Sequence, residues 1–395
     1  MNSNQEAIIR ILKAFLNDQQ NIDIPRDVDW KTFSRLVEIN SISGIVGYVF
    51  QQLNTGQIPF EIQEKYESDF LSTIMITTIR DEDMKSLINL LNKNGIDHLL
   101  FKGYIVKDLY TVPELRTYGD IDFAIRKESR GKCNALMKHS GFRLLDDWEP
   151  VYSYEKNNEH YEIHTELLDS NLNNNYDYKA HFRDFWKHAT CIGQHSYTLD
   201  PEFHLLYLLI HIAKHVYSSG AGIRMYLDIA FYIREYHYKI DWEHFQREVQ
   251  TFKLEQFVNT VLSAIEQWFE IERPIPLKAI DDAFMDEFLS FTLNGGVFGH
   301  NSKVAKLSQV RQNSQGQSVK RVDTLRKRAF PSIDTIKSKY VYLESKPWLL
   351  PVAWVHRFFI KKGSTADYLN ESKKILRTNK KDIIELNDFY QKIGI

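Results

Sequence analysis

The sequence predicts an α+β fold in which a small mixed sheet is embedded in a mostly helical protein. Over most of the 395 residues, apolar side chains recur at helical spacing. From about residue 95 to 168 the pattern changes to short β-prone runs separated by turns. We therefore expect an N-terminal helical region over residues 1–92, an α/β core over 93–170 and a C-terminal helical region over 171–395.

The N-terminal helices are expected because Ile8, Ile11, Leu12 and Phe15 lie on one helical face. The core then begins with the apolar run IDHLLF, which suits a buried strand and leads through a turn at Lys102 into a helix. The alternating run DIDFAI predicts a second strand. Two further runs, VYSYEK and HYEIHTEL, flank a pair of asparagines and predict an antiparallel hairpin.

After Asp200, long helical patterns such as PEFHLLYLLIHIAKHVY predict the C-terminal helices. The apolar stretch at 347–360 contains Pro351, His356 and Arg357 and is shorter than the roughly 20 residues that a spanning helix needs. We expect a buried helix there, with a role at a membrane surface as the alternative. No membrane span is predicted.

The composition restricts the partners and the compartment. The 50 Lys and Arg residues nearly balance the 52 Asp and Glu residues, so no strong general attraction to nucleic acid is expected. The two cysteines, Cys133 and Cys191, form no disulfide framework, and the N-terminus lacks the pattern of a secretion signal. The expected location is the cytoplasm.

The strongest chemical signal is the pair Asp120 and Asp122 in the second predicted strand. Side chains two apart on a strand point to the same face, so the two carboxylates would lie side by side and repel unless a cation lay between them. The hairpin would bring Glu162 next to them. Three carboxylates suit Mg²⁺, with Mn²⁺ as the alternative, and a metal site of this kind accepts phosphate oxygens from a nucleotide. Glu162 would hold a metal or accept a proton from the attacking group.

Basic and flexible residues upstream complete a predicted nucleotide site. Gly103 would let the backbone come close to a phosphate, and Lys102 would add a positive charge. Arg116 would either contact a phosphate or pair with one of the two aspartates.

These segments resemble a group of uncharacterised nucleotidyltransferases in the polymerase-β-like nucleotidyltransferase superfamily. The resemblance extends over roughly residues 90–360 and is carried by FKGYIVKDLY, LRTYGDIDFAIRK, YEIHTEL, HLLYLLIHIAKHVYSSGAGIRMYLDIAFYI, GGVFGH and AFPS. It implies a Mg²⁺-dependent fold that binds an NTP such as ATP and transfers NMP to an acceptor hydroxyl on a small molecule or protein, releasing pyrophosphate. In the wider superfamily, Gly-Gly or Gly-Ser usually stands in place of Lys102-Gly103, and the third acid is more often an aspartate than a glutamate.

The resemblance also implies a cleft between the helical region and the α/β core, with lining residues His164, His211, Lys214, His215, Arg224 and Asp228. The spacing of His211 and His215 is also that of zinc ligands, but Ile212 stands where a zinc protease has its glutamate. His164 is more often a supporting residue than a ligand.

Other interpretations remain open at this stage. The fold could have become a nucleotide-binding regulatory module without turnover, since the usual Gly-Ser turn is replaced. A γ-phosphate transferase would need a catalytic loop that we do not find. The basic run Lys320, Arg321, Arg326, Lys327 and Arg328 is interpreted as a solvated face, with contact to a triphosphate or an acidic partner as the alternative.

Overall fold

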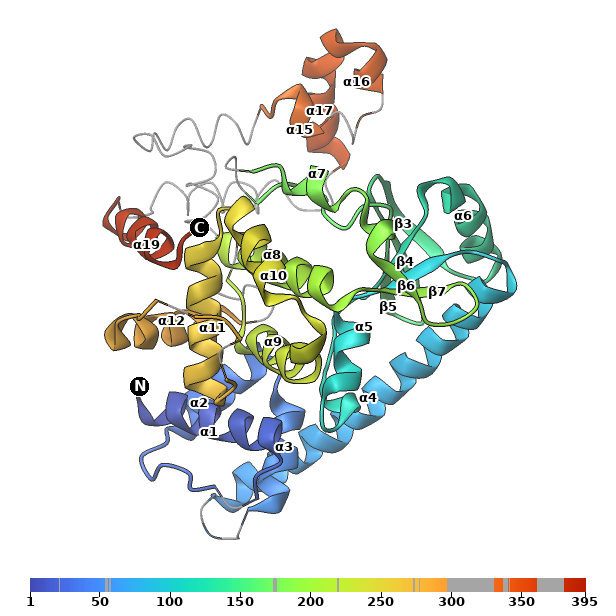
Figure 1. The fold of residues 1–395 in the computed structure, drawn as a ribbon. Coiled ribbons are helices and arrows are strands. Elements are labelled where there is room, and N and C mark those ends of the chain that lie inside the picture. The colour runs from blue at the N-terminus through green and yellow to red at the C-terminus, as the bar shows by residue number, and fades with distance from the viewer. Residues whose placement is uncertain are drawn as a thin grey trace.

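The computed structural model describes all residues except 21, 54, 55, 57, 173–175, 219, 273, 277, 297–329, 337–339, 341 and 361–379. The basic run at 320–328 lies outside the described residues, as do most of GGVFGH and the first residue of AFPS. In the described part, helices surround one mixed sheet, and the predicted α+β class is confirmed (Figure 1).

Four helices precede the sheet: α1 (Ser3–Asn17), α2 (Trp30–Ile39), α3 (Ser43–Gln52) and α4 (Phe60–Lys93). Helix α1 begins where Asn2 and Gln5 cap each other's backbone, and the Asp29 side chain caps α2. The 34-residue α4 extends from the N-terminal helices to the sheet (Figure 1). Its last turns bury Met84, Leu87 and Leu91 in the core beneath the strands.

The sheet has seven strands in the order β3-β4-β5-β2-β1-β7-β6. The bounds are β1 (His98–Leu100), β2 (Ile121–Ile125), β3 (Arg143–Trp148), β4 (Val151–Lys156), β5 (Glu159–His164), β6 (Ala189–Cys191) and β7 (Ser196–Leu199). The pairs β2–β5 and β1–β7 are parallel and the other pairs are antiparallel. The expected hairpin is confirmed as β4 and β5, with Asn157 and Asn158 both at positive φ in the turn.

Two strands of this sheet come from beyond residue 170. Strand β7 pairs with β1 in parallel and β6 pairs with β7, so the sheet continues to Leu199. Short helices connect the strands: α5 (Gly103–Val106), α6 (Arg130–His139) and α7 (Tyr178–Phe182). The division into 1–92, 93–170 and 171–395 stays a proposal, and the strand pairing would place the end of the α/β core at Leu199.

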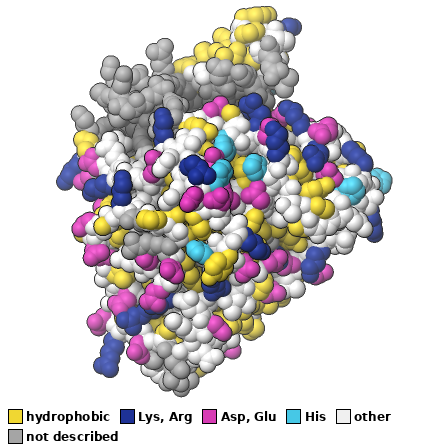
Figure 2. Space-filling model, in the orientation of Figure 1, with side chains coloured by type: hydrophobic (Ala, Val, Ile, Leu, Met, Phe, Trp, Pro, Cys, Tyr) yellow, Lys and Arg dark blue, Asp and Glu magenta, His cyan; other side chains and the backbone are white. Residues whose placement is uncertain are grey.

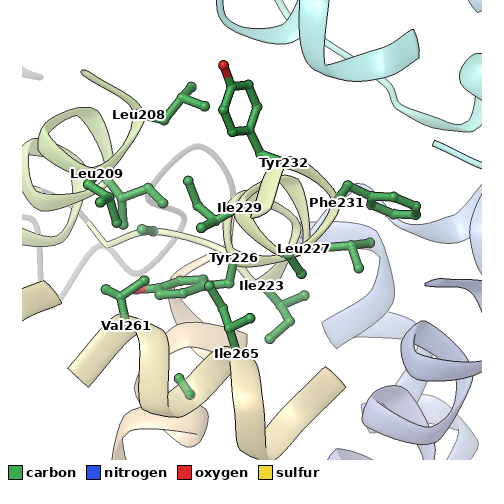
Figure 3. Packing of buried hydrophobic residues seen from close by; sticks show 14 of the residues in the cluster. Leu208, Leu209, Ile223, Tyr226, Leu227, Ile229, Phe231, Tyr232, Val261 and Ile265 are labelled. Carbon is green, nitrogen blue, oxygen red and sulfur yellow. The ribbon is translucent and has the colours of Figure 1, made fainter. Parts of the chain in front are cut away.

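The C-terminal region is helical, as expected: α8 (Pro201–Ser218), α9 (Ile223–Tyr236), α10 (Trp242–Thr251), α11 (Glu255–Phe269), α12 (Asp282–Gly295), α15 (Ile333–Ile336), α16 (Tyr342–Ser345), α17 (Leu350–Ile360) and α19 (Lys380–Ile393). Helix α9 lies at the centre. Figure 3 shows its side chains between Leu208 and Leu209 of α8 and Val261 and Ile265 of α11. Because α9 is buried on nearly every face, its position is fixed by packing on all sides.

The expectation of a buried helix at 347–360 is only partly correct. Ala353 of α17 is fully buried in a small separate cluster, but Trp348, Val352 and Val355 are 74%, 54% and 58% exposed. In the described part, α17 has 11 residues and packs against α15 and α16, which have four residues each, so too few neighbours are present to cover its second face. Among the described residues, none of the helices combines the length and apolar character that crossing a bilayer requires.

The close packing of α3 on α4 depends on Gly47. A Cβ atom at Gly47 would lie 2.1 Å from the backbone oxygen of Tyr66, so Gly47→Ala must push the two helices apart. We expect this substitution to lower the free energy of unfolding by roughly 1–3 kcal/mol in urea denaturation. The matched control is Gly131→Ala in α6, where an added Cβ would meet nothing within 4 Å. That variant should gain up to about 1 kcal/mol from helix propensity, and equal effects at both sites would contradict the prediction.

Candidate functional site

The parallel pairing of β2 and β5 brings the predicted acids together. Asp122 of β2 stands directly beside Glu162 of β5 in the register. Ile121 and Phe123 turn to the opposite side and are buried in the core, which fixes the direction of Asp122. Asp120 lies one residue before β2, and its side chain is 49% exposed. Sequence alternation thus placed the three carboxylates correctly on one face.

Two groups of potential metal ligands share Glu162. Asp122, Glu162 and His164 form one group and Asp120, His160 and Glu162 form the other, with ligand atoms within 4.8 Å of one another in each. His160 was not among the predicted site residues. The signal for it was present, since the alternation of β5 places His160 and Glu162 on the same face.

Asp122 is the most enclosed of the three acids. Its Oδ1 atom accepts a hydrogen bond from Lys102 Nζ at 2.8 Å and lies 2.8 Å from His164 Nε2. Lys102, predicted to contact a phosphate, therefore contacts the carboxylate in this structure. Among the described residues, neither Asp120 nor Glu162 forms an ion pair with a lysine or arginine. One lysine thus faces three acids, and the excess of negative charge favours a cation.

The surroundings shift the pKa values of Asp122 and Glu162 in opposite directions. Burial alone would raise the pKa of Asp122, but Lys102 and His164 outweigh it and hold that pKa well below its ordinary value. Burial, and then the nearby Asp122, raise the pKa of Glu162. Burial and the positive charge of Lys102 lower the pKa of His164, so that its ring stays neutral. Glu162 is consequently a more basic carboxylate than Asp122.

The turn before α5 has an unusual backbone that Arg116 helps to shape. Lys102 adopts a positive φ of 52°, and its backbone N–H donates to His204 Nε2 at 3.3 Å. Gly103 has no room for a side chain, because a Cβ would lie 2.1 Å from a guanidinium nitrogen of Arg116. The glycine therefore admits Arg116, whereas the sequence predicted that it would admit a phosphate; phosphate contact by Gly103 stays a prediction.

Arg116 pairs with neither Asp120 nor Asp122. Its Nε and Nη2 atoms donate to the two oxygens of Asp228 on α9, at 3.2 and 2.7 Å. The hydroxyl of Tyr110 also donates to Asp228, at 2.7 Å. The expected ion pair with a strand aspartate is thus wrong, because a carboxylate more than 100 residues away in the sequence already satisfies both prongs of the guanidinium.

A second buried network holds the loop that leads into β2. Asp81 of α4 accepts hydrogen bonds from Lys107 Nζ and from the Tyr118 hydroxyl, both at 2.9 Å. Arg80, the residue before it, donates to the backbone oxygen of Tyr118. Helix α4 therefore fixes the chain two residues ahead of Asp120. This contact could not be predicted from the sequence, since Asp81 is one of many charged residues on a long helix.

Most of the predicted residues line one cavity of about 290 Å³: Lys102, Gly103, Arg116, Asp120, Asp122, Glu162, His211, His215, Arg224 and Asp228. His164 lies behind Asp122, and Lys214 instead pairs with Asp169. In the described part of the chain, no group of metal-ligating side chains contains His211 or His215. The rings of these two histidines pack against each other, with their centroids 4.6 Å apart. On the side of the molecule seen in Figure 2, histidine side chains lie next to acidic and basic side chains near the middle.

Comparison with protein families identifies a related family. A family model described as an uncharacterised nucleotidyltransferase matches residues 26–270, which include every strand of the sheet and all residues of the cavity. No curated protein and no solved structure matches the chain. The two carboxylate and histidine groups have the oxygen donors that Mg²⁺ or Mn²⁺ requires, so the residues present fit a divalent ion.

The buried His204 predicts an acid-sensitive fold. Burial lowers its pKa to about 3, whereas a histidine in the unfolded chain titrates near 6.5. Between these values the unfolded chain binds more protons at this residue, so the free energy of unfolding must fall as the pH drops below about 6.5. Between pH 7 and pH 5, His204→Gln should lose roughly 1–2 kcal/mol less than the wild type in urea denaturation. The control His139→Gln, at an exposed position, should follow the wild type; identical curves for all three proteins would contradict the assignment.

Proposed function

Since the chain belongs to the family of uncharacterised nucleotidyltransferases, we propose that it transfers NMP from an NTP to an acceptor hydroxyl and releases pyrophosphate, with Mg²⁺ or Mn²⁺ as cofactor. One observation carries the proposal: a carboxylate just before β2, one on β2 and one on the adjacent β5 converge and line a cavity together with buried cationic groups. Such an arrangement suits a substrate that brings both phosphate and a divalent cation.

The catalytic residues in this proposal are Asp120, Asp122 and Glu162, which would hold the metal. When bound, the divalent ion supplies positive charge that balances the phosphates and lowers the pKa of the attacking hydroxyl. His164 would orient Asp122 through the 2.8 Å contact. Lys102 forms an ion pair with Asp122. With a metal ion bound to Asp122, the lysine would be able to turn toward the phosphates.

The reaction requires one bond to form and one to break. The acceptor oxygen attacks the α-phosphorus, and the bond from this phosphorus to the oxygen bridging to the β-phosphate breaks with its electron pair on pyrophosphate. The hydroxyl proton has to leave at the same stage. Glu162 would take this proton if it does not itself hold the metal, because it lies beside Asp122 and lines the cavity.

A nucleotide-binding module without turnover is the second candidate. It is favoured by the ion pair between Lys102 and Asp122, which already neutralises the most buried acid. In that case NTP would bind to the cationic part of the cavity, and the carboxylates would have only a structural role. The proposed domain division applies equally to both candidates, whereas an acceptor, either a small molecule or a protein, belongs to the transferase proposal alone.

The transferase proposal predicts a sharp loss of product in Asp122→Asn and Glu162→Gln. With NTP labelled at the α-phosphate and a panel of small-molecule and protein acceptors, both should transfer label at least about 100-fold more slowly than the wild type. Excess EDTA should abolish transfer and added Mg²⁺ or Mn²⁺ should restore it.

Asp146→Asn is the matched control, since Asp146 is an exposed acid on β3 outside the cavity. It should retain the wild-type rate. If label never leaves the nucleotide with any acceptor while Asp122→Asn binds NTP as tightly as the wild type, the module without turnover is the correct interpretation.

A further inference from the structure

Arg224 is a buried cation that the site described so far does not use. It is the second residue of α9, it is 4% exposed, and it lines the same cavity as Asp122 and Glu162. Its Nη1 atom donates to the Thr117 hydroxyl, but its Nε atom is buried without a hydrogen-bond partner. Within the part of the chain that the structure describes, Arg224 forms no ion pair.

The nearest carboxylate does not neutralise Arg224. Both oxygens of Asp228 already accept from Arg116, and Tyr110 adds a third hydrogen bond. Burial, and then the charge of Arg116, lower the pKa of Arg224 to about 10, so its guanidinium is still protonated at neutral pH. A buried charge with an unused donor costs free energy unless something pairs with it.

The surrounding backbone adds positive potential at the same place. Helix α9 has 14 residues and no acidic residue in its first turn. The backbone N–H of Ile223 donates to Asn40 Oδ1 and that of Met225 donates to the Gly222 oxygen, so the helix dipole, and not a set of free N–H groups, is what favours an anion at this end. Helix α9 is packed between α8 and α11 (Figure 3), and this packing holds its first turn in place beside the cavity that Arg224 lines.

We propose that Arg224, in the first turn of α9, binds the phosphate tail of the nucleotide, while Arg116 has a positioning role. A polyphosphate fits better than a single carboxylate, because Lys102, Arg116 and Arg224 all line one cavity. Arg116 is paired with Asp228 and shapes the turn at Gly103, whereas Arg224 has no ion-pair partner in the described structure and can therefore pair with the ligand. The identity of the ligand rests on the proposed nucleotidyl transfer, whereas the anion site itself does not.

Calorimetry with inorganic tripolyphosphate in EDTA tests the site independently of transfer. The full chain should bind tripolyphosphate, and Arg224→Met should weaken binding at least about tenfold. Arg224→Lys, which keeps the charge but loses the two-pronged geometry, should give an intermediate affinity. Arg234→Gln on the same helix is the control; Arg234 donates to the backbone of Leu16 and is not a lining residue, so its loss should leave the affinity unchanged.

A stability measurement separates a binding role from a structural one. Since Arg224 has no ion-pair partner in the described structure, Arg224→Met should be at least as stable as the wild type in urea denaturation. Unchanged binding of tripolyphosphate by Arg224→Met, or no binding by the wild type, would overturn the proposal. The affinities for ATP and for AMP show which part of the nucleotide Arg224 contacts. If Arg224→Met weakens the binding of ATP and of AMP equally, Arg224 does not contact the phosphate tail, and that part of the proposal fails. A failed transfer assay alone would refute the proposed function and leave the anion site standing.

Discussion

The structure depends on the placement of Asp122, a carboxylate that the parallel pairing of β2 and β5 forces next to Glu162. Two acids at adjacent strand positions repel each other, and burial makes the repulsion more costly. The chain compensates with a lysine from the turn before α5 and a neutral histidine from β5 itself. Lys102 reaches this carboxylate from a backbone with positive φ whose N–H donates to His204, and the glycine that follows leaves room for Arg116.

Two buried ion pairs then hold the segment that supplies the acids. The ion pair of Arg116 with Asp228 ties the loop before β2 to α9. The ion pair of Lys107 with Asp81, together with the hydrogen bond from Tyr118 to Asp81, ties the same loop to α4. Buried pairs of this kind often add little net stability compared with apolar residues, but removal of one partner is costly. Their value here is geometric, because they fix a loop with little regular secondary structure immediately before the strand that carries Asp122.

The local parts of this arrangement could be predicted from the sequence. Strand alternation placed Asp120 and Asp122 on one face, and the paired asparagines marked the β4–β5 hairpin. What could not be predicted depends on distant partners. The spacing of Arg116 from the aspartates suggested an ion pair with them, but its partner is on α9, and nothing near Asp81 in the sequence indicated Tyr118. The two added strands were missed for the same reason, since β7 joins the sheet through β1, about 100 residues earlier. His160 could have been predicted from the sequence, because it lies two residues before Glu162 on the same face of β5 and Glu162 was predicted.

The cavity consequently has two electrostatic ends. At the strand end, three carboxylates face a single lysine, and at the α9 end, two buried guanidinium groups face a single carboxylate. Neither end is neutral, and the protein does not bring the two excesses into contact, because Arg116 is held by Asp228 and Arg224 is held by Thr117. A ligand that carries an anion and recruits a divalent cation would neutralise both ends at once, whereas a simple cation or a simple anion would neutralise only one. This separation of charge across one small cavity is the physical basis for proposing a metal-bound nucleotide as the ligand in place of either component alone.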